Sequence, residues 1–254
     1  MRERSGIVTL TTDFGHADPY VAALEAALLQ TNWDVRVVHN SHEVAPGDIA
    51  TGAYLLEYAA RSFPPGTVHL AVVDPGVGSS RPIIAIETEA FVLVGPDNNL
   101  LERALRGMAA RAVELESGME AAPTFESRDV MAPAAARLAG GADLVALGSA
   151  MERGSYELAP VLGLDTRLTS VCHVDRFGSL VLDLRHPGAW PEGKQWLDVN
   201  GKRARLGRTF SDVAPGELVA YRGSIGYVEV AARNSSAAQV IGSATGDAVE
   251  VALS

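Results

Sequence analysis

The stretch VHLAVVDPGVGSSRP, from Val68 to Pro82, passes from a continuous apolar run into a loop of prolines, glycines and charges. An apolar run without polar alternation is typical of a strand covered on both faces, as in a parallel sheet between helices. The Pro-Gly pair then ends the strand. Two interpretations of the charges stay open here: Asp74 and Arg81 are turn-forming residues, or they are a catalytic pair.

Outward from this stretch, apolar runs alternate with segments of helical period through the first half of the chain. The apolar runs cover residues 7–12, 35–39, 68–74, 82–87 and 91–96. The helix-period segments follow Asp18, Asp48, Asn98 and Asp129. Strand and helix in alternation predict an α/β domain, with a mostly parallel sheet between helices, over residues 1–160.

The second part of the chain has a different pattern, in which short strands are separated by turn residues. The pair Asn200-Gly201 lies between two such strands and is a strong hairpin signal. Helical periodicity is nearly absent there. We therefore predict a small, mostly antiparallel β domain over residues 161–254, a class of structure that includes barrels.

Composition limits the kinds of partner. The chain has 254 residues, 47% of them hydrophobic, and a formal net charge of -10. It can bury a sizeable core, and its acidity argues against nucleic acid or an anionic membrane as a partner. No apolar run approaches the ~20 residues of a membrane span, and the first residues do not resemble a signal peptide. We therefore expect a cytoplasmic protein.

Disulfide and metal chemistry are not expected. Cys172 is the single cysteine, which excludes an internal disulfide and a cysteine-based metal cluster. His39 and His42 are three residues apart, but no pattern of carboxylates completes a zinc or iron site around them. The sequence therefore predicts no metal ligands.

Three of the predicted strands end on acidic or amide side chains. Asp13 follows the first strand, Asp74 the third, and Asp97 with Asn98 the fifth. Ligands of α/β sheets bind beyond the carboxyl ends of the strands, so we expect these side chains to line one acidic crevice. Carboxylates repel phosphate, and GVGSSR lacks the lysine and the spacing of a P-loop. A ribose fits better, because a carboxylate accepts hydrogen bonds from both hydroxyls of a vicinal diol.

Six motifs in a fixed order make the chain resemble a known family. They are TTDFGHADPYV, FPPGTVHLAVVDPGVGSSR, GPDNN, TFESRD, DRFGS and GSIGYVEVA. The chain resembles the S-adenosylmethionine hydrolases, or SAM hydroxide adenosyltransferases, which are related to enzymes that fluorinate or chlorinate the same substrate. The resemblance implies a homotrimer whose substrate lies between the first domain of one subunit and the second domain of its neighbour. It also implies that water or hydroxide attacks the ribose C5′ of S-adenosylmethionine, yielding adenosine and L-methionine without a metal or cofactor.

The resemblance also implies roles for particular residues. The family's catalytic acid and arginine match Asp74 and Arg81, and Glu126 stands where the hydrolases usually have a histidine. Asp13 would hold the ribose hydroxyls, and Phe177 would stack on the adenine. The implied substrate contacts are Asp13, Asp18, Asn98, Phe125, Ser127, Asp175, Phe177, Ser179, Ser224 and Glu229.

The chain departs from the family pattern at three positions. Glu126 replaces the histidine, Ser179 replaces an asparagine, and Asn99 replaces a glycine. A carboxylate at position 126 beside Asp74 can still act as a general base. The leading hypothesis is a hydrolase; the alternative is a catalytically weak or inactive protein that binds adenosine or S-adenosylmethionine. A generic nucleotide-binding protein is disfavoured because no phosphate motif is present. Because the halogenating relatives carry an uncharged residue at the position of Asp74, this acid favours water over a halide.

Overall fold

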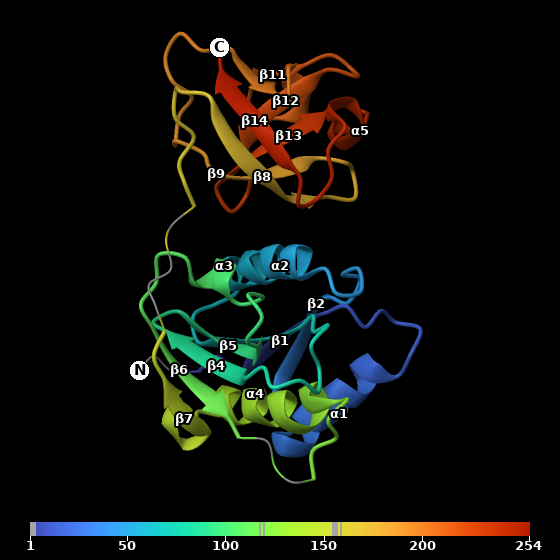
Figure 1. Cartoon of the computed structure of the whole chain (residues 1–254), viewed down its shortest axis with the longest axis vertical. Coiled ribbons are helices and arrows are strands. Elements are labelled where there is room, and N and C mark those ends of the chain that lie inside the picture. Colours follow the sequence, from blue (N-terminus) through green and yellow to red (C-terminus); the bar gives the residue numbers. More distant parts are fainter. Residues whose placement is uncertain (1–3, 117, 119, 154–156, 158) are drawn as a thin grey trace. The chain divides into compact units, whose positions relative to one another are not determined.

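The chain consists of two units, Met1–Glu157 and Leu158–Ser254, in the computed structural model (Figure 1). The structure describes residues 4–116, 118, 120–153, 157 and 159–254. Each unit contains one seven-stranded sheet, and the sheet of the second unit closes into a barrel. None of the helices among these described residues is both long and apolar enough to cross a membrane.

The first unit is a layered α/β structure with the sheet order β2-β1-β3-β5-β4-β6-β7. Its strands are β1 (Ile7–Thr12), β2 (Arg36–Ser41), β3 (Thr67–Val72), β4 (Ile83–Thr88), β5 (Phe91–Pro96), β6 (Ala110–Leu115) and β7 (Gly148–Met151). Its helices are α1 (Tyr20–Thr31), α2 (Ile49–Ser62), α3 (Glu102–Leu105) and α4 (Ala132–Ala139), with a π-helical turn η1 (Ser127–Met131) and a 3-10 turn η2 (Leu144–Ala146).

The prediction of a mostly parallel sheet was wrong, because the sheet is mixed. β2, β1, β3 and β5 run parallel, whereas β4, β6 and β7 join it through antiparallel pairs. Only Glu89 and Ala90 separate β4 from β5. Two residues suffice for a hairpin but not for the crossover that parallel neighbours need. The apolar pattern did not reveal this, since β4 and β5 are as deeply buried as the parallel strand β3.

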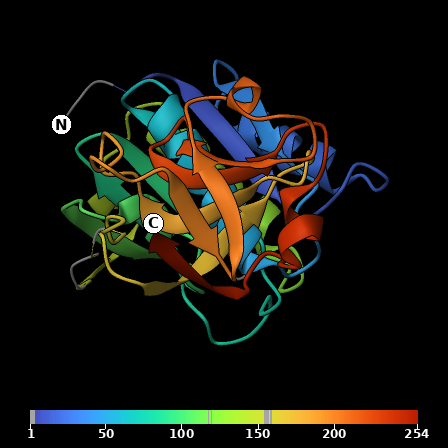
Figure 2. The same ribbon diagram turned by 90° about the horizontal axis from the view of Figure 1, so that it is seen from above.

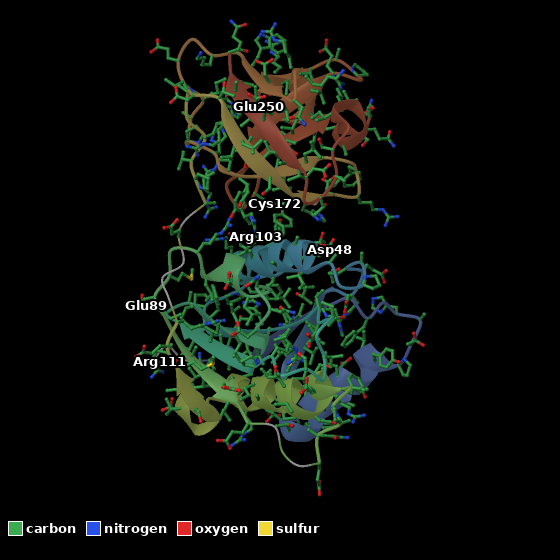
Figure 3. All side chains as sticks on the ribbon, in the orientation of Figure 1. Asp48, Glu89, Arg103, Arg111, Cys172 and Glu250 are labelled. Carbon is green, nitrogen blue, oxygen red and sulfur yellow. The ribbon has the colours of Figure 1, made fainter. Side chains whose placement is uncertain are left out.

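Helices cover both faces of this sheet and bury a separate apolar core on each. α1 and α4 lie on one face, and α2 and α3 lie on the other (Figure 1). On the α2 face, Leu56 packs in one cluster with Leu93 of β5. Each such buried leucine stabilises the fold by roughly 1.5–3 kcal/mol. Asp48, labelled in Figure 3, starts α2 by accepting a hydrogen bond from the backbone N–H of Thr51 over 3.0 Å.

The parallel half of the sheet determines where polar loops gather. β1 pairs with β3, with Thr12 opposite Val72, and β3 pairs with β5. Their carboxyl ends therefore lie at one edge of the sheet. The loops that begin with Asp13, Val73 and Asp97 leave the sheet at this edge.

The second unit is a closed barrel with the strand order β10-β11-β12-β13-β9-β8-β14, seen in yellow to red in Figure 2. Its strands are β8 (Arg167–Val174), β9 (Leu180–Arg185), β10 (Trp196–Val199), β11 (Lys202–Leu206), β12 (Leu218–Arg222), β13 (Tyr227–Ala232) and β14 (Ala248–Leu253). A 3-10 turn η3 (Phe210–Asp212) and helix α5 (Ala237–Ile241) complete it. Cys172 is buried in β8 (Figure 3).

The prediction of a small antiparallel β domain was also wrong. The barrel has as many strands as the first sheet, and β11 pairs with β12 in parallel. The connection between Leu206 and Leu218 contains η3 and is long enough to bring the chain back in the same direction. The hairpin at Asn200-Gly201 is confirmed: both residues have positive φ, 47° and 75°, as a tight turn between twisted strands requires.

Candidate active site

The loop after β3 holds Asp74 and Arg81 against each other. Arg81 Nε donates to Asp74 Oδ1 over 2.8 Å, and Arg81 Nη2 forms an ion pair with Asp74 Oδ2. The backbone N–H of Gly76 donates to the same carboxylate over 3.2 Å. Only 5% of the Asp74 side chain and 9% of the Arg81 side chain are exposed. The loop thus buries a charged pair at the carboxyl edge of the sheet.

Glu126 is the third charged member of this group. Arg81 Nη2 donates to Glu126 Oε2 over 2.6 Å, and 14% of the Glu126 side chain is exposed. Burial by itself would lower the pKa of Arg81, but the hydrogen bonds and charges of Asp74 and Glu126 outweigh it and raise that pKa. One guanidinium therefore bridges two carboxylates, and the group carries a net charge of one negative unit.

One buried atom of this group lacks a polar contact. Arg81 Nη1 has no hydrogen-bond partner among the described residues, whereas Asp74 Oδ2 lies in the ion pair with Arg81 Nη2. An unsatisfied buried polar atom costs about 1–3 kcal/mol, so Nη1 favours the binding of a polar molecule. Nη1 is a donor, and the Asp74 carboxylate has further lone pairs that can accept, which suits a water or a hydroxyl group.

A cavity of about 300 Å³ opens beside Asp74. It is lined by Asp13, Phe14, Tyr20, Val72, Asp74, Val77, Thr124, Phe125, Ser127 and Met131. Four residues predicted from the sequence thus line one cavity: Asp13, Asp74, Phe125 and Ser127. Asp13 Oδ2 accepts a hydrogen bond from the backbone N–H of Gly47 over 2.8 Å.

Three aromatic rings form the apolar side of this cavity. The ring centroids of Phe14 and Tyr20 are 6.0 Å apart, and that of Phe125 lies 6.3 Å from Phe14 and 5.6 Å from Tyr20. All three pairs meet edge to face, the arrangement that aromatic pairs prefer. Sequence reasoning missed Phe14 and Tyr20, although both belong to the TTDFGHADPYV motif. The cavity therefore joins an apolar wall to two carboxylates.

Glu126 faces a different hollow from its two neighbours. Phe125 and Ser127 line the cavity of about 300 Å³, whereas Glu126 and Arg81 line a second hollow of about 550 Å³. The π-helical turn that begins at Ser127 follows directly, and such turns are frequent at functional sites. The three charged residues thus lie between two hollows, with Asp74 on one side and Glu126 on the other.

Asp18 and Asn98 are not part of this arrangement. Asp18 is exposed before α1 and does not line the cavity. Asn98 Nδ2 donates to the backbone carbonyl of Val73 over 2.9 Å, so it ties the ends of β3 and β5 together. Its neighbour Asp97 is paired with Arg153 at 2.5 Å and 3.1 Å. The bonds of Asn98 and Asp97 therefore stabilise the loop after β5 at the sheet edge.

In the barrel, Asp175 organises the turn that carries Phe177 and Ser179. Asp175 Oδ1 accepts from the backbone N–H groups of Phe177 and Ser179 over 2.9 Å and 2.8 Å. Gly178 has φ +83°, and a Cβ there would lie 2.2 Å from Ser236 Oγ, so only glycine fits. Phe177 is 81% exposed while Ser179 is buried. The turn therefore presents one ring outward and one hydroxyl inward.

Glu229 belongs to the same end of the barrel as Ser179. It lies opposite Tyr221 in the β12–β13 pair, and the Tyr221 hydroxyl bonds both Glu229 and Ser179. Burial raises the pKa of Glu229, the bond with Tyr221 lowers it, and the charge of Asp175 raises it, with a net rise. Burial and Glu229 likewise raise the pKa of Tyr221.

Tyr221 was missed because only the strand register places it beside Glu229. The remaining predicted contact, Ser224, lies in the turn between β12 and β13.

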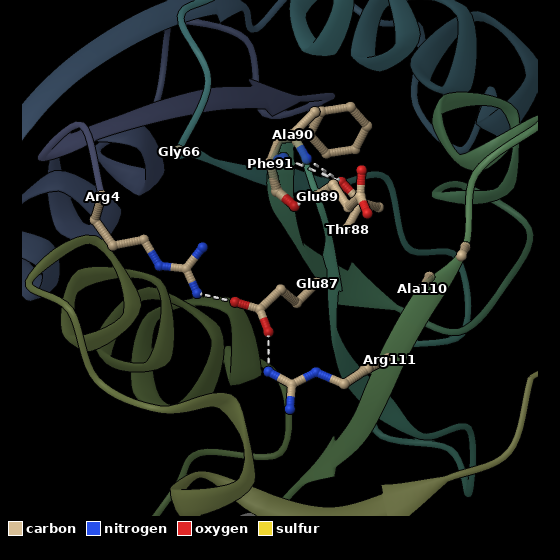
Figure 4. A pocket seen from close by; sticks show the side chains of 10 residues that line it. Arg4, Gly66, Glu87, Thr88, Glu89, Ala90, Phe91, Ala110 and Arg111 are labelled. Carbon is tan, nitrogen blue, oxygen red and sulfur yellow. Dashed lines mark hydrogen bonds and ion pairs between the residues drawn. The ribbon is translucent and has the colours of Figure 1, made fainter. Parts of the chain in front are cut away.

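A larger cavity lies elsewhere in the first unit. It measures about 710 Å³, and Glu87 pairs there with both Arg4 and Arg111 (Figure 4). None of the predicted site residues lines it. It includes Phe91, the first residue of β5, and so lies at the opposite end of that strand from Asp97. Among the described residues, no group of three or more His, Cys, Asp or Glu side chains is arranged to hold a metal ion.

Comparisons with known proteins match both units. The family models for the SAM hydroxide adenosyltransferase N-terminal and C-terminal domains match residues 8–148 and 169–250. An (R)-S-adenosyl-L-methionine hydrolase of Salinispora tropica is 40% identical over 96% of this chain and 97% of its own length. A protein of the same name from Thermus thermophilus is 37% identical over 92% of this chain and 95% of its own length.

More distant proteins also match over nearly the whole chain. A fluorinase of Nocardia brasiliensis is 26% identical over 98% of this chain and 97% of its own length. The crystal structure of an uncharacterized conserved protein from Thermotoga maritima is 29% identical and superposes with a TM-score of 0.85, covering 97% of this chain and 99% of that one. The similarity thus spans both units.

Proposed function

The chain belongs to the SAM hydroxide adenosyltransferase family, and from this premise we propose that it is an enzyme that hydrolyses S-adenosylmethionine to adenosine and L-methionine. One observation carries the proposal. The bridged group Asp74–Arg81–Glu126 places the Asp74 carboxylate in the wall of a cavity that also contains Asp13. That cavity thus offers one carboxylate to a ribose diol and another to a water.

In the proposed reaction, a water oxygen forms a bond to the ribose C5′ while the C5′–S bond breaks. The electron pair of that bond stays on sulfur, so the sulfonium becomes the neutral thioether of methionine. The proton of the water passes to the carboxylate of Asp74, which acts as general base. Because the leaving group is already cationic, the protein has chiefly to place the water in line and to keep other solvent away.

Arg81 and Glu126 support Asp74 in this scheme. Arg81 fixes the Asp74 carboxylate through Nε and Nη2 and thereby holds it at the cavity wall. Glu126 lines the other hollow and contacts Arg81, so we assign it the role of holding the guanidinium in place.

For the substrate, we propose that Asp13 holds the ribose hydroxyls and that Phe125 and Ser127 contact the reacting end of the ribose. In the barrel, Asp175, Phe177, Ser179, Ser224 and Glu229 are proposed to bind the adenine and methionine parts. The outward ring of Phe177 is suited to stacking on adenine. The homotrimer, the sharing of the site between subunits and the cytoplasmic location stay predictions.

The test is direct. Purified protein is incubated with S-adenosylmethionine, and adenosine is measured by chromatography over a range of pH. We expect adenosine and methionine in equal amounts, and turnover lowered at least ~100-fold in Asp74→Asn, the effect of removing a general base. Asp34→Asn, a change at an exposed aspartate of the same unit, should leave turnover unchanged. Binding of adenosine without any turnover would instead support the alternative, an inactive binding protein.

A further inference from the structure

Three histidines gather beside the turn that carries Asp13. His42 Nδ1 lies 2.8 Å from the Thr12 hydroxyl, and His42 Nε2 lies 2.7 Å from His39 Nδ1. The ring of His16 meets that of His42 edge to face at 5.1 Å. Thr12 is the residue before Asp13 in the chain. A continuous chain of polar atoms therefore runs from the surface residue His39 to the neighbour of Asp13.

The carboxylate at the outer end of this series of polar atoms favours one arrangement of its protons. Glu25 Oε2 is 3.6 Å from His39 Nε2, an ion-pair distance, and we infer that this nitrogen carries the proton when the His39 ring is neutral. His39 Nδ1 is then an acceptor and takes the Nε2–H of His42. His42 Nδ1 is in turn an acceptor, and the Thr12 hydroxyl donates to it. The Thr12 oxygen is left to accept from the backbone N–H of Phe14, which is 3.2 Å away.

His42 also holds the other side of the Asp13 turn. Its backbone carbonyl accepts from the N–H of Gly15 over 2.8 Å, while its ring bonds Thr12. Farther along the same loop, the N–H of Gly47 donates to Asp13 Oδ2 over 2.8 Å. The loop after β2 thus hydrogen-bonds Thr12 and Gly15, which lie on either side of Asp13, and also the Asp13 carboxylate itself. His42 is only 2% exposed, so water cannot easily replace these bonds.

We propose that His42 is a positioning residue for Asp13: its Nε2–H tautomer, set by His39 and Glu25, aims the Asp13 carboxylate at a ribose diol. This inference rests on the proposed function of Asp13. A carboxylate has about four lone-pair sites, so the bond from Gly47 leaves room for both hydroxyls of the diol. The titratable side chains that face the imidazole are His39 and His16. Burial, followed by those two charges, lowers the pKa of His42 to about 4, and the ring is therefore neutral at neutral pH.

The test separates recognition of the diol from general damage. Affinities for adenosine and for 2′,3′-dideoxyadenosine are measured by calorimetry for the unmodified protein, His42→Leu and His42→Gln. We expect His42→Leu to weaken adenosine about 10-fold or more, the scale of a hydrogen bond to a charged group, and to change dideoxyadenosine less than about 2-fold. Glutamine has a carbonyl acceptor and an NH2 donor group in its amide, so His42→Gln should recover most of the loss. Asp34→Asn, at an exposed side chain outside the histidine cluster, is the control and should bind both nucleosides normally.

Proton-detected nitrogen-15 spectra of the histidine rings supply a second measurement. His42 should show the Nε2–H tautomer at neutral pH in the unmodified protein. Equal losses for both nucleosides in His42→Leu, or a His42 ring that carries its proton on Nδ1, would overturn the inference. If the unmodified protein fails to prefer adenosine over dideoxyadenosine, the assignment of Asp13, and with it the proposed function, is what fails.

Discussion

Replacing Arg81 by methionine should give the protein a pH-dependent loss of stability. In the structure one guanidinium nitrogen, Nη2, contacts both Asp74 and Glu126, and neither carboxylate is more than 14% exposed. Methionine removes the cation and leaves two like charges side by side, so the local charge changes from one to two negative units. Removing one partner of a buried ion pair costs about 3–5 kcal/mol.

Repulsion between the two carboxylates favours uptake of a proton by one of them in the folded variant. The folded state then binds more protons than the unfolded chain, and stability falls as the pH rises. We therefore expect Arg81→Met to lower the free energy of unfolding by about 3–5 kcal/mol at pH 8. The loss at pH 5 should be smaller by at least ~1 kcal/mol, because protonation relieves the repulsion.

Unfolding in guanidinium chloride at pH 5 and pH 8 measures this difference in unfolding free energy. A second substitution tests its cause. Adding Glu126→Gln to Arg81→Met removes one of the two charges and should recover at least ~1 kcal/mol at pH 8. Adding Glu114→Gln, at an exposed glutamate that lines the same hollow as Glu126, should recover nothing. An equal loss at both pH values, or equal recovery by the two second substitutions, would refute the bridged arrangement.

Four further outcomes are expected. Asp74→Asn should lower kcat at least ~100-fold while adenosine still binds, as calorimetry would show; a smaller loss means that another group is the base. Glu126→Gln should lower kcat about 10-fold with KM nearly unchanged, because it acts through Arg81; a rise in KM alone would argue for direct substrate contact. Burial and Asp175 raise the pKa of Glu229 against the opposing bond from Tyr221, so its folded form binds a proton more tightly. Glu229→Gln should therefore become more stable relative to the unmodified protein as the pH rises from 4 to 8, and a constant difference in unfolding free energy would contradict this. Gly178→Ala should cost about 1–3 kcal/mol more than Gly188→Ala, since both have positive φ but only the first would press a Cβ against Ser236; equal costs would mean that contact is unimportant.

The grouping of candidate site residues could be predicted from sequence where their positions follow from buried strands. Asp13 and Asp74 each follow an apolar run, and runs of that kind form the central parallel strands β1 and β3. The two carboxylates therefore lie at one edge, in one cavity. Asn98 shows the limit of that argument, because a polar side chain at a strand end can have a structural role instead. Asn98 donates a hydrogen bond to the backbone carbonyl of Val73.

Features that depend on register or on chain reversal could not be predicted in the same way. Burial alone does not distinguish β4 and β5 from parallel strands, and the two-residue connection at Glu89 and Ala90 was the signal that mattered. Tyr221 meets Glu229 only through the register of β12 and β13. The direction of Glu126 depends on the backbone before η1, which turns it away from its neighbours and toward Arg81. Contacts between residues that are distant in sequence, such as Arg81 and Glu126, do not follow from the local sequence pattern.

The most direct test of the central claim, that water attacks the ribose C5′ of S-adenosylmethionine, is to run the reaction in water enriched in oxygen-18. Mass spectrometry of the nucleoside product then reports where the oxygen came from. The proposed function predicts adenosine that carries the heavy isotope in its 5′-hydroxyl group, with methionine free of it. Absence of adenosine, or adenosine with unlabelled oxygen at C5′, would contradict it.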